Sequence, residues 1–96
     1  MGLPVPLSFD WDNENIDKNW KKHQVHYKEA EEVFYNRPIR IYRNIVHSLT
    51  EKRFSVLGIT DSKRLLYISF PIRGGYLRVI SARDQSKKER SIYAKK

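Results

Sequence analysis

The sequence predicts an α+β fold in which a short strand and two helices precede an antiparallel sheet, and a short helix ends the chain. Three observations predict it. Apolar residues recur at helical spacing in the first third of the chain, and they follow strand spacing between residues 39 and 81. A helix-capping sequence then lies near the C-terminus. At 96 residues the chain is one domain. We expect it over residues 9–96, after an extended, proline-containing arm at residues 1–8.

The first elements are a short strand and a helix. Phe9 and Trp11 alternate with polar residues, which predicts a strand over residues 8–12. Asp12 or Asn13 then offers a favoured helix N-cap. Three residues recur at i, i+4 and i+7, and we expect them to form the buried stripe of a helix that ends near residue 23: Ile16, Trp20 and His23.

A second helix is predicted over residues 27–35. Four residues at helical spacing form its apolar face: Tyr27, Ala30, Val33 and Phe34. Three acidic residues form its solvated face: Glu29, Glu31 and Glu32. The helix should stop before Pro38, because the residue that precedes a proline avoids helical dihedral angles.

Four strand-like runs follow the second helix, at residues 39–42, 54–59, 65–72 and 76–81. Residues 43–50 between the first two are predicted to be a loop. The later connections have turn composition, at Asp61-Ser62 and at Arg73-Gly74-Gly75. Because these connections are short, the strands that they join should be antiparallel. Ser86 and Glu89 have capping-box spacing and predict the start of the last helix.

The composition excludes several classes of site. The chain has no cysteine, which excludes disulfides, thiol catalysis and the commonest structural zinc sites. No apolar stretch approaches the roughly 20 residues that cross a bilayer, and the first residues do not resemble a secretion signal. We therefore expect a cytoplasmic protein that does not bind membranes. The net charge is +8, and residues 78–96 hold seven Lys or Arg against two Asp or Glu. This imbalance predicts a polyanionic partner.

Three arginines lie at or within the predicted strands: Arg53, Arg78 and Arg83. A single arginine in such a position is usually solvated. Three further cations follow in the last helix: Lys87, Lys88 and Arg90. Cations gathered on one face repel one another unless an anion offsets them. Phosphate is the natural anion, since arginine binds it in bidentate fashion.

The remaining candidate groups each have a structural alternative. Glu89 is explained by the capping box, and beside cations it could also act as a base. Tyr93 could pack the last helix, stack on a base or donate a proton. His23 lies on the predicted apolar stripe, where a hydrogen-bonded boundary histidine is more common than a ligand. Asp10 and Asp12 could hold Mg²⁺, but the start of a helix explains them better, so no metal site is predicted.

Two groups of residues resemble BrnT-type toxins. The first group is Phe9-Asp10-Trp11-Asp12, Asn15, Asn19, Lys21-Lys22-His23, Val25, Glu29-Ala30 and Val33-Phe34. The second is Glu51-Lys52-Arg53-Phe54, Leu57-Gly58, Arg78-Val79-Ile80-Ser81-Ala82-Arg83, Glu89-Arg90 and Tyr93. The resemblance extends from residue 9 to residue 93. It implies a RelE-like α+β fold.

The resemblance also implies an endoribonuclease toxin of a type II toxin–antitoxin module that inhibits translation. Such an enzyme cleaves RNA without a metal or cofactor, by attack of a ribose 2′-hydroxyl on the adjacent phosphate. The implied catalytic residues are Arg53, Arg78, Arg83, Glu89, Tyr93 and His23. The implied RNA-binding residues are Lys87, Lys88 and Arg90. The alternative is a non-catalytic RNA- or antitoxin-binding module, an inactive homologue of the toxins.

The partners implied by the resemblance are an RNA substrate and a BrnA-like antitoxin, in a toxin₂–antitoxin₂ complex. Operator DNA would be bound only through the antitoxin. Two positions depart from the family pattern. Gln24 replaces a glycine that caps the first helix, and His26 replaces the serine that begins the second. We expect each change to weaken a helix end by about 1 kcal/mol.

Overall fold

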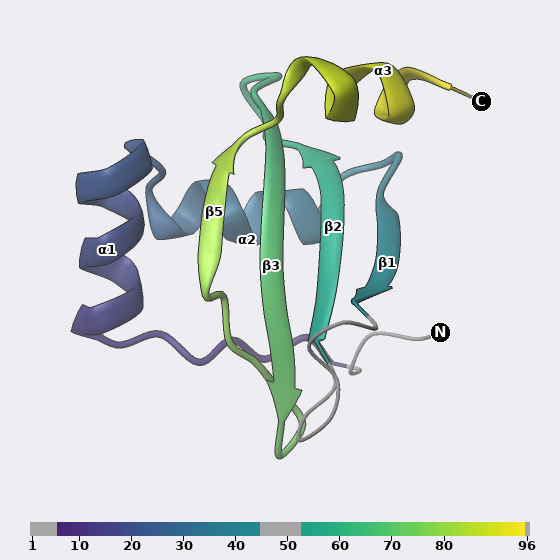
Figure 1. Ribbon diagram of the computed structural model, residues 1–96. Coiled ribbons are helices and arrows are strands. Elements are labelled where there is room, and N and C mark those ends of the chain that lie inside the picture. The colour runs from purple at the N-terminus through teal and green to yellow at the C-terminus, as the bar shows by residue number, and fades with distance from the viewer. Residues whose placement is uncertain (1–5, 45–52, 96) are drawn as a thin grey trace.

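The protein folds into an antiparallel sheet with helices on both of its faces (Figure 1). The computed structural model describes residues 6–44 and 53–95. The elements in chain order are α1 (Asn13–His23), α2 (Tyr27–Tyr35), β1 (Arg40–Asn44), β2 (Arg53–Ile59), β3 (Leu65–Arg73), β4 (Tyr76–Leu77), β5 (Ser81–Asp84) and α3 (Lys87–Ala94). Strand β3 is central, because β2 pairs with it on one side and both β4 and β5 pair with it on the other. The predicted α+β fold is confirmed.

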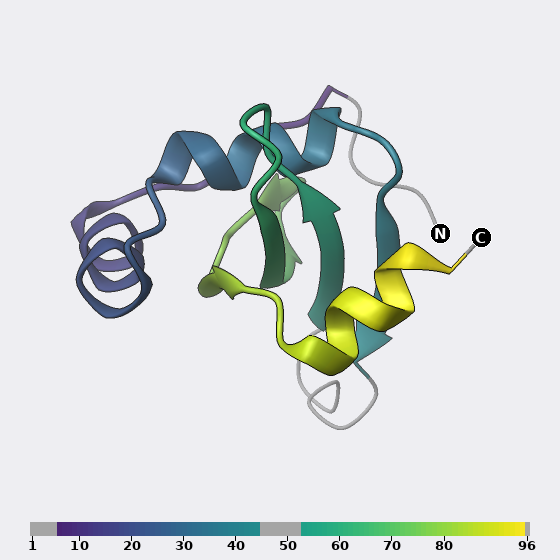
Figure 2. The same ribbon diagram turned by 90° about the horizontal axis from the view of Figure 1, so that it is seen from above.

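The hydrophobic core lies between α2 and one face of the sheet. From above, α2 and α3 lie on opposite faces of the sheet, and α1 lies beyond β5 (Figure 2). Val33 and Phe34 of α2 are buried against Val56, Ile68 and Phe70 of the central strands. Phe34 meets Phe70 edge to face, with ring centroids 5.2 Å apart. Full burial of such side chains stabilises the fold by about 1.5–3 kcal/mol each.

Helix α2 approaches β2 closely at Gly58. A Cβ atom built at this position would overlap Cγ1 of Val33, which is fully buried. The absence of a side chain at Gly58 therefore sets the distance between helix and sheet, and with it the position of β2.

The buried residues of helix α1 are asparagines, so the prediction that an apolar stripe forms its buried face is wrong. Asn15 and Asn19 are buried, whereas Trp20 is 53% exposed. Asn15 donates from Nδ2 to the Val79 carbonyl, and Asn19 accepts from the Ala82 amide at 3.0 Å. The helix thus packs against backbone at the edge of the sheet, where amides and carbonyls need polar partners.

Two predicted strands differ from the structure. Residues 8–12 form only an isolated parallel bridge, in which Leu77 bonds to Ser8 and Asp10. The predicted strand over residues 76–81 is interrupted: β4 ends at Leu77, and β5 begins only at Ser81 and continues to Asp84. The interruption lies opposite Pro71 of β3, whose carbonyl accepts from the Arg78 amide. Because proline has no amide hydrogen, it cannot return a bond to this partner, and the ladder is interrupted.

The helix ends follow the predicted signals. The Asp12 side chain caps α1. At the end of that helix Gln24 adopts left-handed angles, with φ 52°. His26 caps α2, because its Nδ1 accepts from the Lys28 amide, so the imidazole supplies an acceptor in place of serine. Most of the predicted arm (residues 1–5) and most of the predicted loop (residues 45–50) lie outside the described residues. Arg43 and Asn44, which belong to the predicted loop, are instead the last residues of β1. No helix in the described ranges is long and apolar enough to cross a membrane.

Candidate functional site

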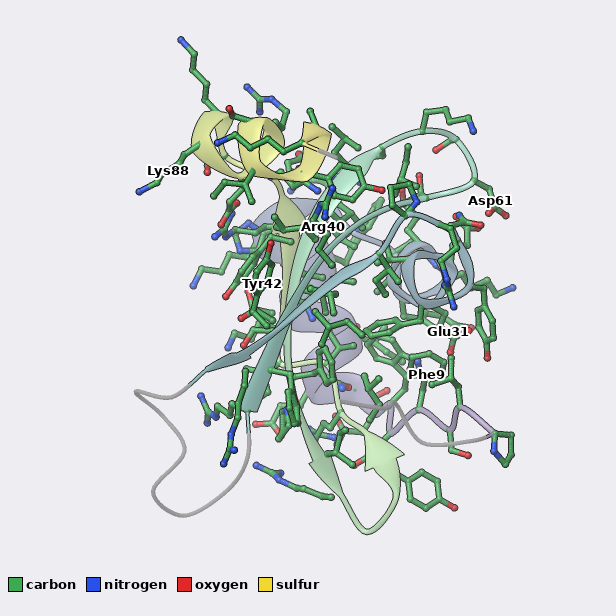
Figure 3. The ribbon with its side chains drawn as sticks, turned by 90° about the vertical axis from the view of Figure 1, so that its right-hand side faces the viewer. Phe9, Glu31, Arg40, Tyr42, Asp61 and Lys88 are labelled. Carbon is green, nitrogen blue, oxygen red and sulfur yellow. The ribbon has the colours of Figure 1, made fainter. Side chains whose placement is uncertain are left out.

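The sheet face away from α2 carries polar and aromatic side chains. The strand register places Leu57, Tyr67 and Arg83 in one cross-strand row, and Ser55, Ser69 and Ser81 in the next. We call this surface the open sheet face, and define it by Arg40, Tyr42, Arg53, Ser55, Leu57, Tyr67, Ser69, Ser81 and Arg83. In a side view, Tyr42 and Lys88 lie on the opposite side of the sheet from Phe9 and Glu31 (Figure 3).

An arginine–glutamate pair lies where β5 meets α3. Arg83 donates to both carboxylate oxygens of Glu89, at 2.8 Å and 3.0 Å. The Arg83 guanidinium also lies over the Tyr67 ring, 4.1 Å from its centroid. This position over an aromatic face adds a cation–π interaction to the ion pair. Arg83 is thus fixed by an anion and a ring while about a third of its side chain stays exposed.

The capping box of α3 fixes the other half of this pair. The Ser86 hydroxyl accepts from the Glu89 amide, and a Glu89 carboxylate oxygen accepts from the Ser86 amide at 2.8 Å. Bonds from Arg83, and then from the Ser86 backbone, hold the pKa of Glu89 below its usual value. At neutral pH the carboxylate is therefore ionised and can accept a proton.

A cavity of about 240 Å³ lies beside this pair, between α3 and the open sheet face. Its lining is mostly apolar and comes from Tyr42, Leu57, Tyr67, Glu89 and Ile92. The Tyr67 hydroxyl lies 3.0 Å from the Ser55 hydroxyl, which fixes the ring. The cavity thus places two tyrosine side chains next to a glutamate that is paired with an arginine.

Tyr93 anchors α3 to the rest of the fold. Its side chain is buried, and its hydroxyl donates to the Pro38 carbonyl at 2.6 Å. Arg40 donates to the Tyr93 carbonyl from the sheet side. Burial raises the pKa of the Tyr93 hydroxyl. Tyr93 therefore has a packing role in this structure, and its hydroxyl is bonded to backbone and not to the Arg83–Glu89 pair.

The three cations of α3 differ in their surroundings. Lys87 and Lys88 are exposed on the first turn of the helix. Arg90 is exposed as well, and it donates to the Gln85 carbonyl at 2.8 Å. All three lie within one turn of Glu89, so the start of α3 is positively charged.

The structure does not gather Arg53 and Arg78 with Arg83. Arg53 begins β2 and lies two strands away from Arg83. Along the strand direction it comes four residues before Leu57, which lies in the same cross-strand row as Arg83. Strand geometry separates their Cα atoms by roughly 16 Å. Arg78 lies in the segment between β4 and β5, where its Nη1 is 3.0 Å from Asp12 and 3.4 Å from Asp10. Its hydrogen bond lowers the pKa of Asp12.

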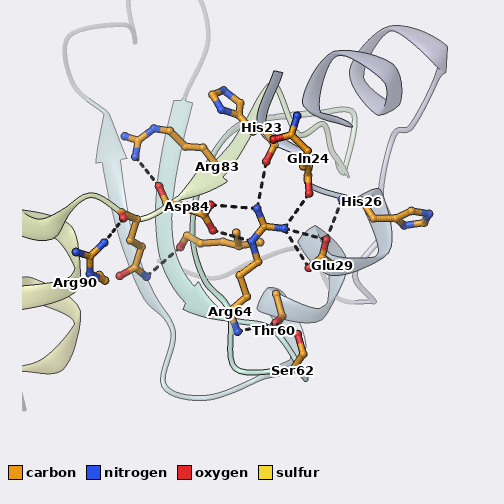
Figure 4. A network of polar contacts seen from close by, with 12 residues as sticks. His23, Gln24, His26, Glu29, Thr60, Ser62, Arg64, Arg83, Asp84 and Arg90 are labelled. Carbon is orange, nitrogen blue, oxygen red and sulfur yellow. Dashed lines mark hydrogen bonds and ion pairs between the residues drawn. The ribbon is translucent and has the colours of Figure 1, made fainter. Parts of the chain in front are cut away.

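His23 lies in a different network, centred on Arg64 (Figure 4). The guanidinium of Arg64 donates to Asp84, to Glu29 and to the carbonyls of His23 and Gln24. Arg64 thereby ties the end of α1 and the start of α2 to β5, and its hydrogen bond lowers the pKa of Asp84. His23 accepts a hydrogen bond in this network through its backbone carbonyl, and its side chain is close enough to Asp84 to contribute to the low pKa of that carboxyl.

Within the described ranges, no three histidine, aspartate or glutamate side chains converge in a way that could hold a metal ion. Asp10 and Asp12, the pair considered for Mg²⁺, are instead ion-paired with Arg78.

Sequence reasoning missed Tyr42, Tyr67 and Ser55 as site residues. The sequence did carry a signal for them. Successive side chains in a strand point to opposite faces of the sheet, and each of these residues lies on the face opposite to the apolar residues that form the core.

Comparison with known proteins identifies the family. No curated protein matches the sequence at a significant level. Residues 11–89 match the family described as the ribonuclease toxin, BrnT, of type II toxin–antitoxin systems. The match includes β5, its arginine and the start of α3 up to Glu89. The chain therefore belongs to the BrnT family of ribonuclease toxins of type II toxin–antitoxin systems.

Proposed function

We propose that the protein is an endoribonuclease toxin whose active site is the junction of the open sheet face with α3. The observation that carries this proposal is the Arg83–Glu89 pair, with Arg83 stacked on Tyr67 at the rim of a cavity. The pair combines a cation that can hold a phosphate with an ionised carboxylate that can accept a proton.

Arg83 binds the scissile phosphate in this mechanism. Its planar fork suits two phosphate oxygens, and its charge stabilises the negative charge that grows on them in the transition state. The Tyr67 ring below it adds a cation–π interaction. Arg53, about 16 Å away, binds a more distant phosphate of the same strand.

Glu89 takes the proton of the attacking ribose 2′-hydroxyl. The 2′-oxygen forms a bond to phosphorus while the bond from phosphorus to the 5′-oxygen breaks. The 5′-oxygen takes a proton from water, and the hydroxide left behind takes the proton from Glu89, which restores the carboxylate. The products carry a 2′,3′-cyclic phosphate and a 5′-hydroxyl, and the reaction needs no metal or cofactor. Of the other candidates, Tyr93 supports α3 from beneath, and His23 and Arg78 are left out of the proposed site because their contacts lie elsewhere.

The cations of α3 hold the phosphates that flank the cut. Lys87, Lys88 and Arg90 project from one short helix next to Glu89, and each phosphate contact made by such a residue adds affinity that salt weakens. A strand of RNA bound there would cross the open sheet face from α3 towards Arg53.

The family implies an antitoxin as the protein partner. We propose that a BrnA-like antitoxin neutralises the toxin by covering the cations of α3 and the open sheet face. The complex would contain two copies of each protein, and it would reach operator DNA through the antitoxin alone. Support comes from the exposed positive charge, which an acidic segment of a partner would complement.

Cleavage of a radiolabelled RNA by the purified protein in EDTA tests the enzyme proposal. We expect a 2′,3′-cyclic phosphate on the upstream product, and a loss of at least about 100-fold in rate for Arg83→Ala. Lys95→Ala, at the end of α3, is the control and should stay near wild type. RNA that is bound but not cut would favour the non-catalytic binding module. Cleavage abolished by EDTA would refute the metal-independent mechanism.

A further inference from the structure

We infer that the cavity under α3 receives the base of a nucleotide next to the scissile phosphate, and that it favours purines without separating adenine from guanine. The inference rests on the proposed function, because it takes Arg83 as the phosphate ligand. It adds a specificity determinant to a site whose catalytic pair does not itself distinguish bases.

The walls of the cavity suit a flat aromatic ring. Tyr42 of β1, Leu57 of β2 and Tyr67 of β3 all line it from the open sheet face, and Ile92 lines it from α3. At about 30 Å³ for each water molecule in the liquid, 240 Å³ corresponds to roughly eight waters, which is room for a ring system rather than a single group. Stacking on tyrosine is favourable for every base because each has a π-face.

The position of the cavity fits one nucleotide. Glu89 lines the cavity and also pairs with Arg83, so the phosphate ligand stands at its rim. A nucleotide whose phosphate contacts Arg83 can therefore turn its base inward beneath α3.

The polar groups at the cavity are already engaged, which is why we expect the cavity not to discriminate adenine from guanine. In the proposed substrate complex the Glu89 carboxylate accepts from the attacking 2′-hydroxyl and from the Ser86 amide, so it does not read a base. The Tyr67 hydroxyl is paired with Ser55. Recognition then depends on stacked area, which is larger for a purine than for a pyrimidine, and not on a pattern of hydrogen bonds.

The test uses non-cleavable RNAs with 2′-O-methyl groups, in which the fluorescent base 2-aminopurine replaces each position in turn. We expect quenching of 2-aminopurine by the wild type at a position adjacent to the cleaved bond. Ile92→Trp fills the cavity from the exposed side of α3. It should remove the quenching and lower kcat/KM for purine sites by roughly 10- to 100-fold, as the loss of one stacked base would do. Ser91→Trp places the same side chain on the same helix outside the cavity lining, and should keep both properties.

The readouts separate this inference from the proposed function. Quenching by a wild-type protein that cuts no RNA would support the base site while refuting the enzyme proposal. Normal cleavage without quenching at any position would refute the base site and leave the enzyme proposal intact. The inference is also overturned if Ile92→Trp cleaves RNA as Ser91→Trp does and loses only antitoxin binding, since the cavity would then receive a protein side chain. The quenching experiment uses the wild type, so it does not depend on the folding of a variant.

Discussion

Replacing Glu89 by glutamine separates the chemistry of this residue from its structural role. Glu89 caps α3 through the Ser86 amide and pairs with Arg83. Glutamine is itself a good residue at this position of a capping box, so the cap should persist. The substitution removes the negative charge and the ability to take a proton, and little else.

The structure sets the expected magnitudes. The Arg83 and Glu89 side chains are 35% and 20% exposed, so solvent screens the pair and its loss should cost about 0.5–1 kcal/mol of unfolding free energy. Loss of a general base should lower kcat by roughly 10²- to 10⁴-fold. Activity should therefore fall far more than stability does.

The pH dependence gives a second measure of the same prediction. Because the folded-state pKa of Glu89 is lowered from 4.5, the carboxylate stabilises the fold above the unfolded pKa, and this contribution is lost as the pH falls through the folded pKa. The stability difference between wild type and Glu89→Gln should be constant near neutral pH and shrink below about pH 4.5. In kcat/KM, the wild type should lose activity over the same acid range, and the variant should not.

The assays are initial rates on a fluorogenic RNA and urea unfolding, both measured across the pH range. Glu14→Gln is the control, because that carboxylate is 88% exposed and lies near Arg78, away from the site. If Glu89→Gln cut RNA within a few-fold of wild type, Glu89 would not be the general base. If it instead unfolded the protein, its role would be mainly structural.

Three further variants test how the fold supports the site. Asn19→Ala should lower the free energy of urea unfolding by about 1–3 kcal/mol, since the buried Ala82 amide loses its acceptor; an unchanged midpoint would contradict this. Gly58→Ala should cost about 1–3 kcal/mol through overlap with Val33, and a thermal melt equal to wild type would show that α2 can move away. Arg78→Ala should lower stability in low salt while RNA cleavage stays within a few-fold of wild type; a loss of cleavage as large as that expected for Arg83→Ala would return Arg78 to the site.

Local signals were sufficient for most of the fold. The second helix begins and ends at the predicted residues, because its apolar spacing and the following proline are both local in the chain. The capping box of Ser86 and Glu89 is likewise formed as expected. Such features depend on residues a few positions apart, so no knowledge of the tertiary structure is needed to recognise them.

The errors arose where distant segments meet. Helical spacing alone favoured Trp20 as a buried residue, but the surface that α1 meets is backbone, and asparagines satisfy it. Pro71 is nearer in the chain, in the other strand of the same hairpin, but its effect depends on the pairing register, which the pattern of residues 76–81 alone does not reveal. Tertiary polar partners of this kind cannot be read from hydrophobic periodicity.

The same limit applies to the prediction of the candidate site. Sequence reasoning named Arg83 and Glu89, since both stand out in a short basic segment, but it could not separate them from Arg78. That distinction depends on Asp10 and Asp12, which are more than sixty residues away in the chain and hold Arg78 at the other end of the molecule.

In the proposed mechanism, substrate binding activates Glu89 as a base through its pairing with Arg83. In the free protein, hydrogen bonds from Arg83 are the largest cause of the low pKa of Glu89, which makes this carboxylate a weak base. A phosphate that accepts the two Arg83 donors competes directly with Glu89 for them. As Arg83 turns to the phosphate, Glu89 loses the contact that lowers its pKa, and its affinity for a proton rises. The Ser86 amide still holds the carboxylate in place. The base would thus become stronger only when a phosphate is bound beside it, so the ion pair of the free protein is a resting state of the site.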